Sequence, residues 1–330
     1  MNDRHLASKL DDDGMGRTLY LVDSDFRTVA QGWSNGSTGP LDLQNQRNPG
    51  SVFYTSGGPI SNTYATDAAA VQGAVDGATD FRGDKLLLTP GSYSIGTAVS
   101  FDCPGLRVLG PRTGSAKHQR VKVTGTVTAP FTVAAAGDDM EFAYFTAVPL
   151  TAGTFFSGAA AADRGYLHHL FYDATGVTGS TSTEFFNGAA SQDWLVEDCR
   201  FYVDAAQGDA FTLASPLRWT WQDCDFTVGI TAIAWASVFT FTTSALGNIA
   251  RRCYFRGAGG ATAAVFTNIF TGIANVNGQL MISDCRVDGT ALATAGDIET
   301  TFGTTTDVEV VENYLSGDAT TEGGALIKLT

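Results

Sequence analysis

Basic residues are scarce in this chain. Lys and Arg number 20 against 34 Asp and Glu, which gives a formal net charge of −14, and charged residues make up only 16% of the sequence. Nucleic-acid binding needs a basic patch or stripe that neutralises phosphates, and the sequence contains none. We therefore expect no nucleic-acid partner.

Long apolar segments are also missing. No stretch approaches the 18 uninterrupted apolar residues that a membrane-spanning helix requires. Residues 1–14 are rich in charge and lack the apolar centre of a signal peptide. From the sequence we expect neither membrane insertion nor export through an N-terminal signal.

The chain has only five cysteines, and no CxxC or Cys/His pair stands at the spacing of metal ligands. We therefore expect neither a metal site nor a cofactor. Four of the cysteines occupy the fourth place of a recurring six-residue phrase: VEDCRF at 196–201, WQDCDF at 221–226, ARRCYF at 250–255 and ISDCRV at 282–287. Degenerate copies flank these four, LHHLFY at 167–172 and VVENYL at 310–315.

The fourth places of the six phrases lie at positions 170, 199, 224, 253, 285 and 313. Successive phrases are therefore roughly 25–32 residues apart, a spacing that is typical of a solenoid. Before each phrase the apolar residues alternate with period two, which is strand behaviour. Each phrase therefore predicts the end of one strand, a sharp corner and the start of the next strand.

A second series supports this period. Short apolar runs recur at a closely similar spacing around Phe156, Phe186, Phe211, Phe239 and Phe266. Each unit thus carries at least two strands and no helix, which predicts an all-β, single-stranded parallel β-helix. In such a fold like residues stack at about 4.8 Å. The phrase cysteines would form a reduced structural ladder inside it, consisting of Cys199, Cys224, Cys253 and Cys285.

The repeat does not extend to the start of the chain. We predict an extended N-terminal arm over residues 1–62 and the β-helix domain over 63–330. Residues 66–78 form the only convincing helical pattern, with Thr66 or Asp67 as its cap. A lid of this kind would cover the otherwise open sheet edge at the first coil.

A short Ala/Val helix that opens on Thr-Asp is followed by a hydrophobic strand ending in Pro-Gly-Ser-Tyr at 90–93, and then by the Cys- and Phe-bearing coils. Over residues 64–330 this order resembles pectate-lyase-like right-handed parallel β-helices, especially those of virus tailspikes and related virion surface proteins. The resemblance implies a right-handed solenoid, a homotrimer, and attachment to capsid or tail proteins through residues 1–62. No catalytic signature of the enzyme branches is found.

Two kinds of residue are candidates for chemistry. Asp198 and Asp223 occupy equivalent corners of neighbouring coils and could form the carboxylate pair of a glycosidase. The alternative is a solvated ladder of charges, because arginines alternate with these acids. Trp235, expected between the regular strands, and Tyr166 could stack on sugar rings, or could be core or trimer contacts. For the histidine pair at 168–169 we expect a structural role.

The leading functional hypothesis is a virion-surface structural protein: a trimeric capsid decoration, turret or spike, with host glycan as a candidate ligand. It is expected to be non-catalytic. The alternative is a tailspike polysaccharide depolymerase, either a glycoside hydrolase or a lyase.

Overall fold

The computed structural model describes residues 41–44, 51–55, 66–81, 83–112, 119–149, 153–175, 177, 184–203, 207–229, 235–257, 266–272, 278–288, 298–300, 307–311, 314–316 and 327–329. Side chains are described between 66 and 256, apart from those gaps and positions 207, 235 and 236, and again at 281–286. Of the predicted arm at 1–62, residues 1–40, 45–50 and 56–62 lie outside the described residues.

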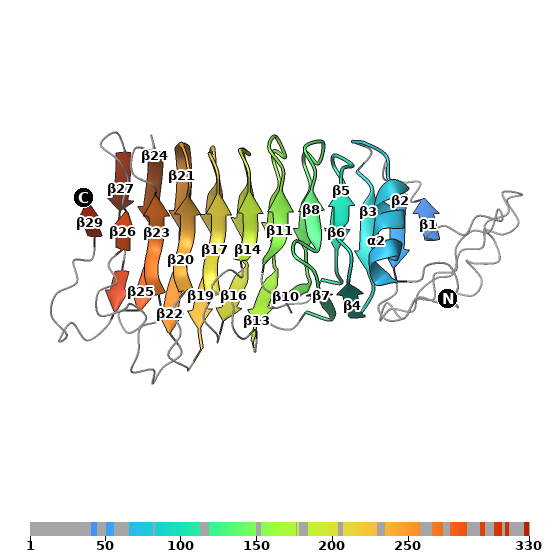
Figure 1. Ribbon diagram of the computed structural model, residues 1–330, viewed down its shortest axis with the longest axis horizontal. Helices are drawn as coiled ribbons and strands as arrows, with labels where there is room; N and C mark the ends of the chain where they lie inside the picture. The colour runs from blue at the N-terminus through green and yellow to red at the C-terminus, as the bar shows by residue number, and fades with distance from the viewer. Residues whose placement is uncertain are drawn as a thin grey trace, which may run out of the picture.

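The described strands form three long sheets that run along one axis (Figure 1). Sheet A contains, in spatial order, β1 Leu41–Gln44, β2 Ser51–Thr55, β3 Lys85–Leu88, β6 Arg107–Leu109, β9 Glu141–Ala143, β12 Tyr166–His168, β15 Leu195–Glu197, β18 Thr220–Gln222, β21 Ala245–Arg251, β24 Gly278–Ser283 and β27 Asp307–Val311. Sheet B contains β4 Gly91–Ile95, β7 Val121–Gly125, β10 Thr146–Pro149, β13 Phe171–Ala174, β16 Arg200–Val203, β19 Asp225–Val228, β22 Tyr254–Gly257, β25 Arg286–Asp288 and β28 Tyr314–Ser316. Sheet C contains β5 Val99–Phe101, β8 Phe131–Val133, β11 Thr154–Gly158, β14 Glu184–Gly188, β17 Gln207–Leu213, β20 Trp235–Phe241 and β23 Phe266–Gly272. A short parallel pair, β26 Ile298–Thr300 and β29 Ile327–Leu329, lies near the end of the chain.

From β3 to β23 each coil contributes one strand to each long sheet, and the strands of successive coils pair in parallel, whereas β1 and β2 pair antiparallel at the start of sheet A. This arrangement confirms the predicted right-handed parallel β-helix. The six-residue phrase behaves as expected: β15 ends at Glu197, Asp198 and Cys199 form the corner, and β16 begins at Arg200.

The predicted lid is the helix α2, Asp67–Asp76, which is capped by Thr66. The Thr66 side chain accepts a hydrogen bond from the Ala69 amide at 3.1 Å, as expected for an N-cap. One face of the helix is buried, through Ala68, Ala70, Val71, Ala74 and Val75.

In the first coil, the outer edges of β3, β4 and β5 are each bonded to another element. Strand β2 pairs with β3 in sheet A. The Ser94 amide of β4 donates to Asp67 of the helix at 2.6 Å, and the Ser100 amide of β5 donates to Gln72 at 2.8 Å. Unpaired edge groups would otherwise recruit other strands. Strands β1 and β2 fall within the segment predicted as an arm, so part of that segment joins sheet A, and the domain boundary stays a prediction.

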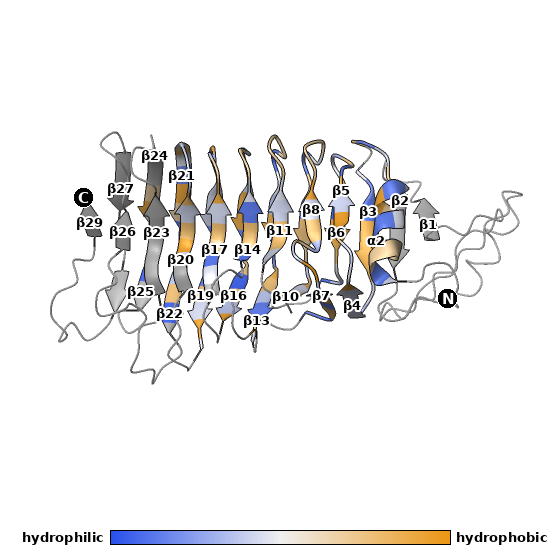
Figure 2. Cartoon of the chain, viewed as in Figure 1, coloured by the Kyte–Doolittle hydropathy of each residue, from blue (hydrophilic) through white to orange (hydrophobic). Residues whose placement is uncertain are grey.

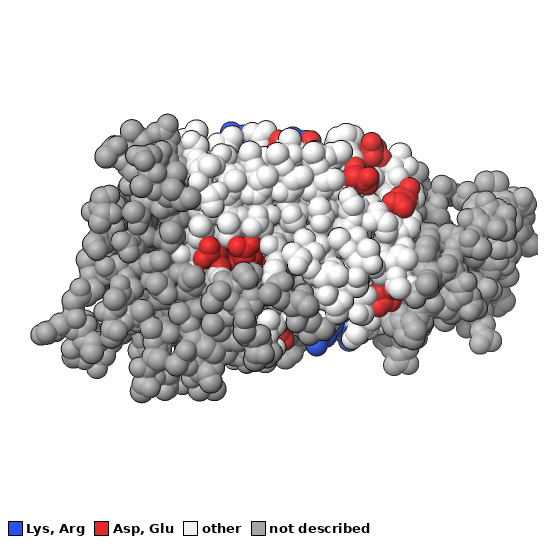
Figure 3. Space-filling view, viewed as in Figure 1, with Lys and Arg blue, Asp and Glu red and all other residues white. Residues whose placement is uncertain are grey.

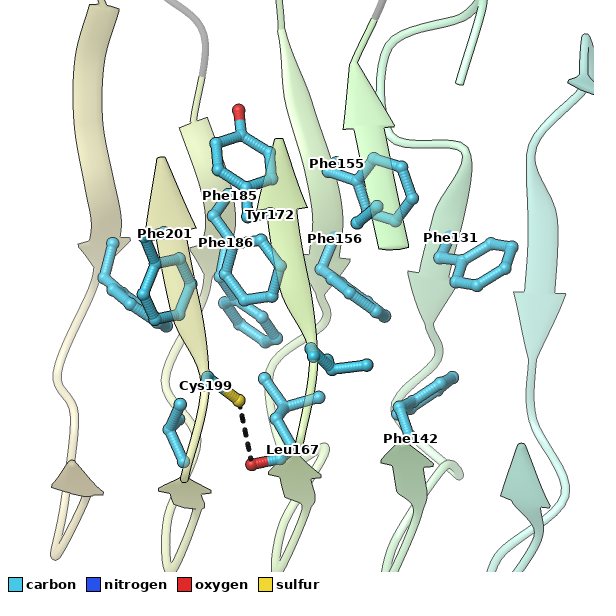
Figure 4. Packing of buried hydrophobic residues seen from close by; sticks show 14 of the residues in the cluster. Phe131, Phe142, Phe155, Phe156, Leu167, Tyr172, Phe185, Phe186, Cys199 and Phe201 are labelled. Atoms are coloured by element: carbon cyan, nitrogen blue, oxygen red, sulfur yellow. Dashed lines mark hydrogen bonds between the residues drawn. The ribbon is translucent and has the colours of Figure 1, made fainter. Parts of the chain in front are cut away.

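The core is a set of apolar ladders between the sheets (Figures 2 and 4). In sheet B the rings of Phe201 and Phe226 stack 4.7 Å apart, and those of Phe226 and Phe255 stack 5.2 Å apart. In sheet C the register aligns Phe186, Phe211 and Phe239 and continues to the next strand at position 270. The predicted phenylalanine series was therefore wrong at its last member, Phe266, which aligns with Trp235 instead. The reason is that β23 is longer than the short run assumed from the sequence.

The phrase cysteines are buried, free thiols on successive coils. Each thiol lies within hydrogen-bond distance of a backbone carbonyl of the preceding coil; Cys199 donates to Leu167 at 3.6 Å (Figure 4). Burial raises the pKa of Cys224 and Cys253 well above the ordinary value. Burial, with nearby acidic groups, raises the pKa of Cys103 to about 12.

We expect these thiols to be unreactive in the native protein, because the thiolate is the reactive species. Ellman's reagent at pH 8 should detect no thiol in the native state and all five after denaturation. Rapid reaction of a phrase cysteine in the folded protein would contradict the buried ladder.

Candidate functional site

A ladder of corner residues follows sheet A along the rod. Its members share a positive φ, between +51° and +63°: Tyr144, His169, Asp198, Asp223, Arg252 and Asp284. Asp, Asn and His tolerate this left-handed conformation better than most residues. The amide of each corner residue from His169 to Arg252 donates to a carbonyl of the next coil. We call this set the corner ladder.

The corner ladder contains both carboxylates that were candidates for catalysis. Asp198 pairs with His169 at 3.0 Å, and Asp223 forms a two-point ion pair with Arg252 at 2.7 Å. The hydrogen bond and charge of Arg252 lower the pKa of Asp223, outweighing the effect of partial burial. A carboxyl group with a lowered pKa is a poor proton donor. The structure thus places the two acids in neighbouring coils but pairs each with a different side chain, His169 or Arg252, and their catalytic role stays a prediction.

Tyr166, a candidate for glycan stacking, lies on the outer face of β12. Its hydroxyl donates to Glu197 of the next coil, and its ring stacks on His168 with 4.2 Å between ring centroids. Burial and the hydrogen bond to Glu197 raise the pKa of Tyr166. The phenol is therefore half-buried within a polar network, with one ring face against His168.

Trp235 was expected between the regular strands, and this expectation was wrong. It is the first residue of β20, and the register pairs it with Gln207 in β17 and Phe266 in β23. Its side chain lies outside the described set, so its role in glycan binding stays a prediction.

A second pair of carboxylates, Glu184 and Asp209, lies on the outer face of sheet C. The register that aligns Phe186 with Phe211 places these two acids side by side on β14 and β17. They form an acidic patch over the two strands (Figure 3). Like charges directly opposite each other on neighbouring strands are destabilising, so such a pair is unusual for a purely structural surface.

Hydroxyl and amide groups hold Glu184 in place. Its Oε2 accepts from Thr154 at 3.0 Å and from Asn187 at 2.8 Å, and its Oε1 accepts from Thr212 at 2.9 Å. The Thr212 hydroxyl also lies 3.4 Å from Asp209 Oδ2. One hydroxyl thus lies within hydrogen-bond reach of both carboxyl groups, so the two acids are near enough to act as a pair, as the two carboxyl groups of a glycoside hydrolase do.

The two acids have different environments. Burial raises the pKa of Asp209, and the charge of Glu184 adds to this effect, while the hydrogen bond from Thr240 opposes it. A hydroxyl has a single hydrogen, and the shorter contact of Thr212 is to Glu184. Asp209 is thus the group more suited to carry a proton, and Glu184 the one suited to act as a carboxylate.

The cysteine phrases gave no indication of this pair, because neither acid lies within a phrase. The available signal was the second series: the residues two places before Phe156, Phe186 and Phe211 are Thr154, Glu184 and Asp209. The two acids are in register only because each precedes its phenylalanine by the same number of places, and Phe186 aligns with Phe211.

Among the residues that the structure describes, no group of three or more His, Cys, Asp or Glu is arranged to hold a metal ion. Within the same part of the chain, no helix has the length and apolar character needed to cross a membrane.

Comparison with known proteins supports the fold. No protein-family model and no curated protein sequence matches the chain. Among solved structures it resembles the pectin methylesterase of carrot, with 13% identity, a TM-score of 0.58, and coverage of 87% of this chain and 90% of that one. It also resembles the tailspike protein of Acinetobacter phage vB_ApiP_P1, with 14% identity and a TM-score of 0.52, over 82% of this chain but only 59% of the tailspike. A rhamnogalacturonan lyase matches with 10% identity and a TM-score of 0.51, over 76% of this chain and 73% of that one.

These identities are too low to transfer an activity, because one fold hosts many functions. What the comparisons and the strand topology establish together is architectural. The chain has the right-handed parallel β-helix fold, which it shares with these solved structures.

Proposed function

We propose that this chain is a virion-surface protein that cleaves a host-surface polysaccharide, with Asp209 and Glu184 as its catalytic acid and carboxylate. The observation that carries this proposal is the bridged carboxylate pair on the outer face of sheet C. It favours the depolymerase alternative over the non-catalytic role expected from the sequence.

The chemistry follows from the two environments. Asp209, with its raised pKa, donates a proton to the glycosidic oxygen and so allows the leaving sugar to depart as an alcohol. The single bridging hydroxyl favours a short separation, at which Glu184 attacks the anomeric carbon and forms a glycosyl ester. Asp209, now ionised, removes a proton from water, and the resulting hydroxide hydrolyses the ester. Both carboxyl groups return to their starting state, and the anomeric configuration is retained.

The surroundings of the pair indicate the class of substrate. The seven strands of sheet C contain no Lys, Arg or His. Their outward positions beside the pair carry hydroxyl and amide groups, such as Thr154, Asn187 and Thr212. An anionic sugar would need a cationic partner when it is bound next to two carboxylates. We therefore propose a neutral polysaccharide as the substrate.

The place on the virion is part of the same proposal. Residues 1–62 would attach the rod to capsid or tail proteins, and the rod would assemble as a homotrimer. The resemblance of the sequence to viral β-helices supports this, and so does the similarity of fold to a phage tailspike.

The test uses the purified full chain and surface polysaccharides extracted from host cells, separated into neutral and anionic fractions. We expect new reducing ends to accumulate from a neutral fraction. Release from anionic fractions alone would overturn the substrate assignment.

A decoration protein without activity is the second candidate, favoured by the ion-paired acids of the corner ladder. Particle binding without release of reducing ends from any fraction would support that candidate and reject the depolymerase.

A further inference from the structure

Two adjacent imidazoles face each other on the outer surface of sheet A. His168 ends β12, and His169 is the corner residue that follows it. Their Nδ1 atoms lie 2.9 Å apart. On the far side of each ring, His168 Nε2 lies 3.0 Å from Glu141 of the preceding coil, and His169 Nε2 lies 3.0 Å from Asp198 of the following coil.

This geometry fixes the number of protons on the pair. Each carboxylate accepts, so both Nε2 atoms must carry hydrogen. The Nδ1–Nδ1 contact needs one further hydrogen, since two lone pairs or two N–H groups would repel at 2.9 Å. Three hydrogens on two rings make one imidazolium and one neutral imidazole.

The surroundings indicate that His168 is the charged ring. Its side chain is only 7% exposed and is paired with Glu141. Its ring stacks on that of Tyr166, with 4.2 Å between ring centroids, and makes a T-shaped contact with that of Tyr144 at 5.1 Å. Aromatic rings stabilise a cation placed against them. Burial would raise the pKa of Glu141, but the hydrogen bond from His168 and the charge of Arg107 bring that pKa below its usual value.

His169 suits the neutral role. Burial lowers the pKa of His169, and the charges of His168 and Arg112 act in the same direction, while Asp198 opposes them. The neutral ring accepts the Nδ1 hydrogen of His168 and donates from Nε2 to Asp198. One proton is therefore sufficient to join three successive coils, through Glu141, the histidine pair and Asp198.

We propose that His168 and His169 form a pH-sensitive latch, closed when the pair holds one extra proton and opened by either gain or loss of a proton. This device is independent of the polysaccharide site. The titratable and charged groups that face the pair from the neighbouring elements are Arg112, Glu141, Tyr144, Tyr166, Glu197 and Asp198, and Lys85 and Arg107 act on Glu141 in turn. Opening would break the side-chain link between the three coils and loosen the surface around the two tyrosines, while the backbone bond from the His169 amide to Glu197 remains.

The expected pH dependence has two limbs. Loss of the shared proton at higher pH would leave two Nδ1 lone pairs facing each other at 2.9 Å, so the latch opens and its contribution to stability is lost as pH rises. Repulsion between the two rings lowers the pKa for the second proton, so stability is lost again as pH falls through that value. Coupled groups titrate as a pair, and the latch should be strongest between the two steps.

Nitrogen-15 NMR of the histidine side chains in the wild-type protein tests the latch directly. At the pH where the latch is closed, we expect His168 to show protonation at both nitrogens and His169 to show the Nε2–H tautomer. Two separate titration steps should follow. Two neutral rings that titrate together near their ordinary value would overturn the proposal.

A second measurement compares denaturant unfolding of the wild type with the His169→Gln variant from pH 4 to 9. Glutamine keeps polarity but cannot share the proton, so the stability difference should peak at intermediate pH. Asp223→Asn, which alters a corner acid outside the latch, serves as the control and should show no such peak. A difference that does not change with pH would reject the latch even if the variant is destabilised.

Discussion

Asp209→Asn is expected to reduce polysaccharide cleavage by about 100–10,000-fold, the usual contribution of a general acid. The same change should leave the protein at least as stable as the wild type. At pH values where Asp209 is ionised, the change removes a partly buried charge beside Glu184, and opposed like charges on neighbouring strands destabilise by up to about 1 kcal/mol. Loss of activity with unchanged or increased stability separates a catalytic acid from a structural residue.

The pH dependence of this stability difference has a definite sign. The pKa of Asp209 is raised in the folded state, so its favourable contribution is present at low pH and is lost as pH rises through the folded value. The free energy of unfolding of the wild type should therefore decrease relative to that of Asp209→Asn as pH increases. Chemical denaturation from pH 3 to 8 measures this difference.

Matched controls are available on the same rod. Glu184→Gln should also abolish cleavage, whereas Asp198→Asn and Asp223→Asn should retain it, because those acids belong to the corner ladder. Suppose instead that Asp198→Asn and Asp223→Asn were inactive while Asp209→Asn and Glu184→Gln were active. The catalytic pair would then be Asp198 and Asp223, and the sheet C pair would be rejected.

Phe211→Ala is expected to lower the free energy of unfolding by about 3–5 kcal/mol, as for other large-to-small changes in a packed core. The Phe211 ring is fully buried and lies between stacked neighbours, 6.4 Å from Phe186 and 5.7 Å from Phe239, measured between ring centroids. It also meets Trp221 of sheet A at 5.6 Å, so its loss opens a cavity that spans two sheets.

Urea unfolding measures this effect, with Thr132→Ala on the outer face of β8 as the control. Surface changes of that kind usually alter stability by less than about 0.5 kcal/mol. Because each coil of a solenoid contacts only its neighbours, hydrogen exchange should accelerate first in the coils around β17. A uniform loss of protection along the rod would contradict this local picture.

The strand-and-corner pattern was predictable because it repeats. An apolar residue that stacks on its equivalent in the next coil must recur once per coil, so the phrases around Cys199 and Cys224 display the period of the fold directly. The helix α2 was predictable as well, since its Thr66 cap and apolar stripe are local features. The left-handed conformation at Asp198 and Asp223 was not anticipated, although Asp is one of the residues that tolerate it.

The polar sites were not predictable in the same way. The uneven spacing of the phrases shows that coil length varies along the chain. The residues that become neighbours on adjacent strands therefore depend on the lengths of the loops in each coil. Glu184 meets Asp209 only through the register of β14 and β17, and His168 meets Glu141 across two strands of sheet A. The sequence by itself determined the repeat, the β-helix and its lid, because these rest on periodic burial of apolar side chains. Tertiary structure alone decided which charges face one another, because side-chain contacts between coils depend on inter-strand register, which no periodic pattern encodes.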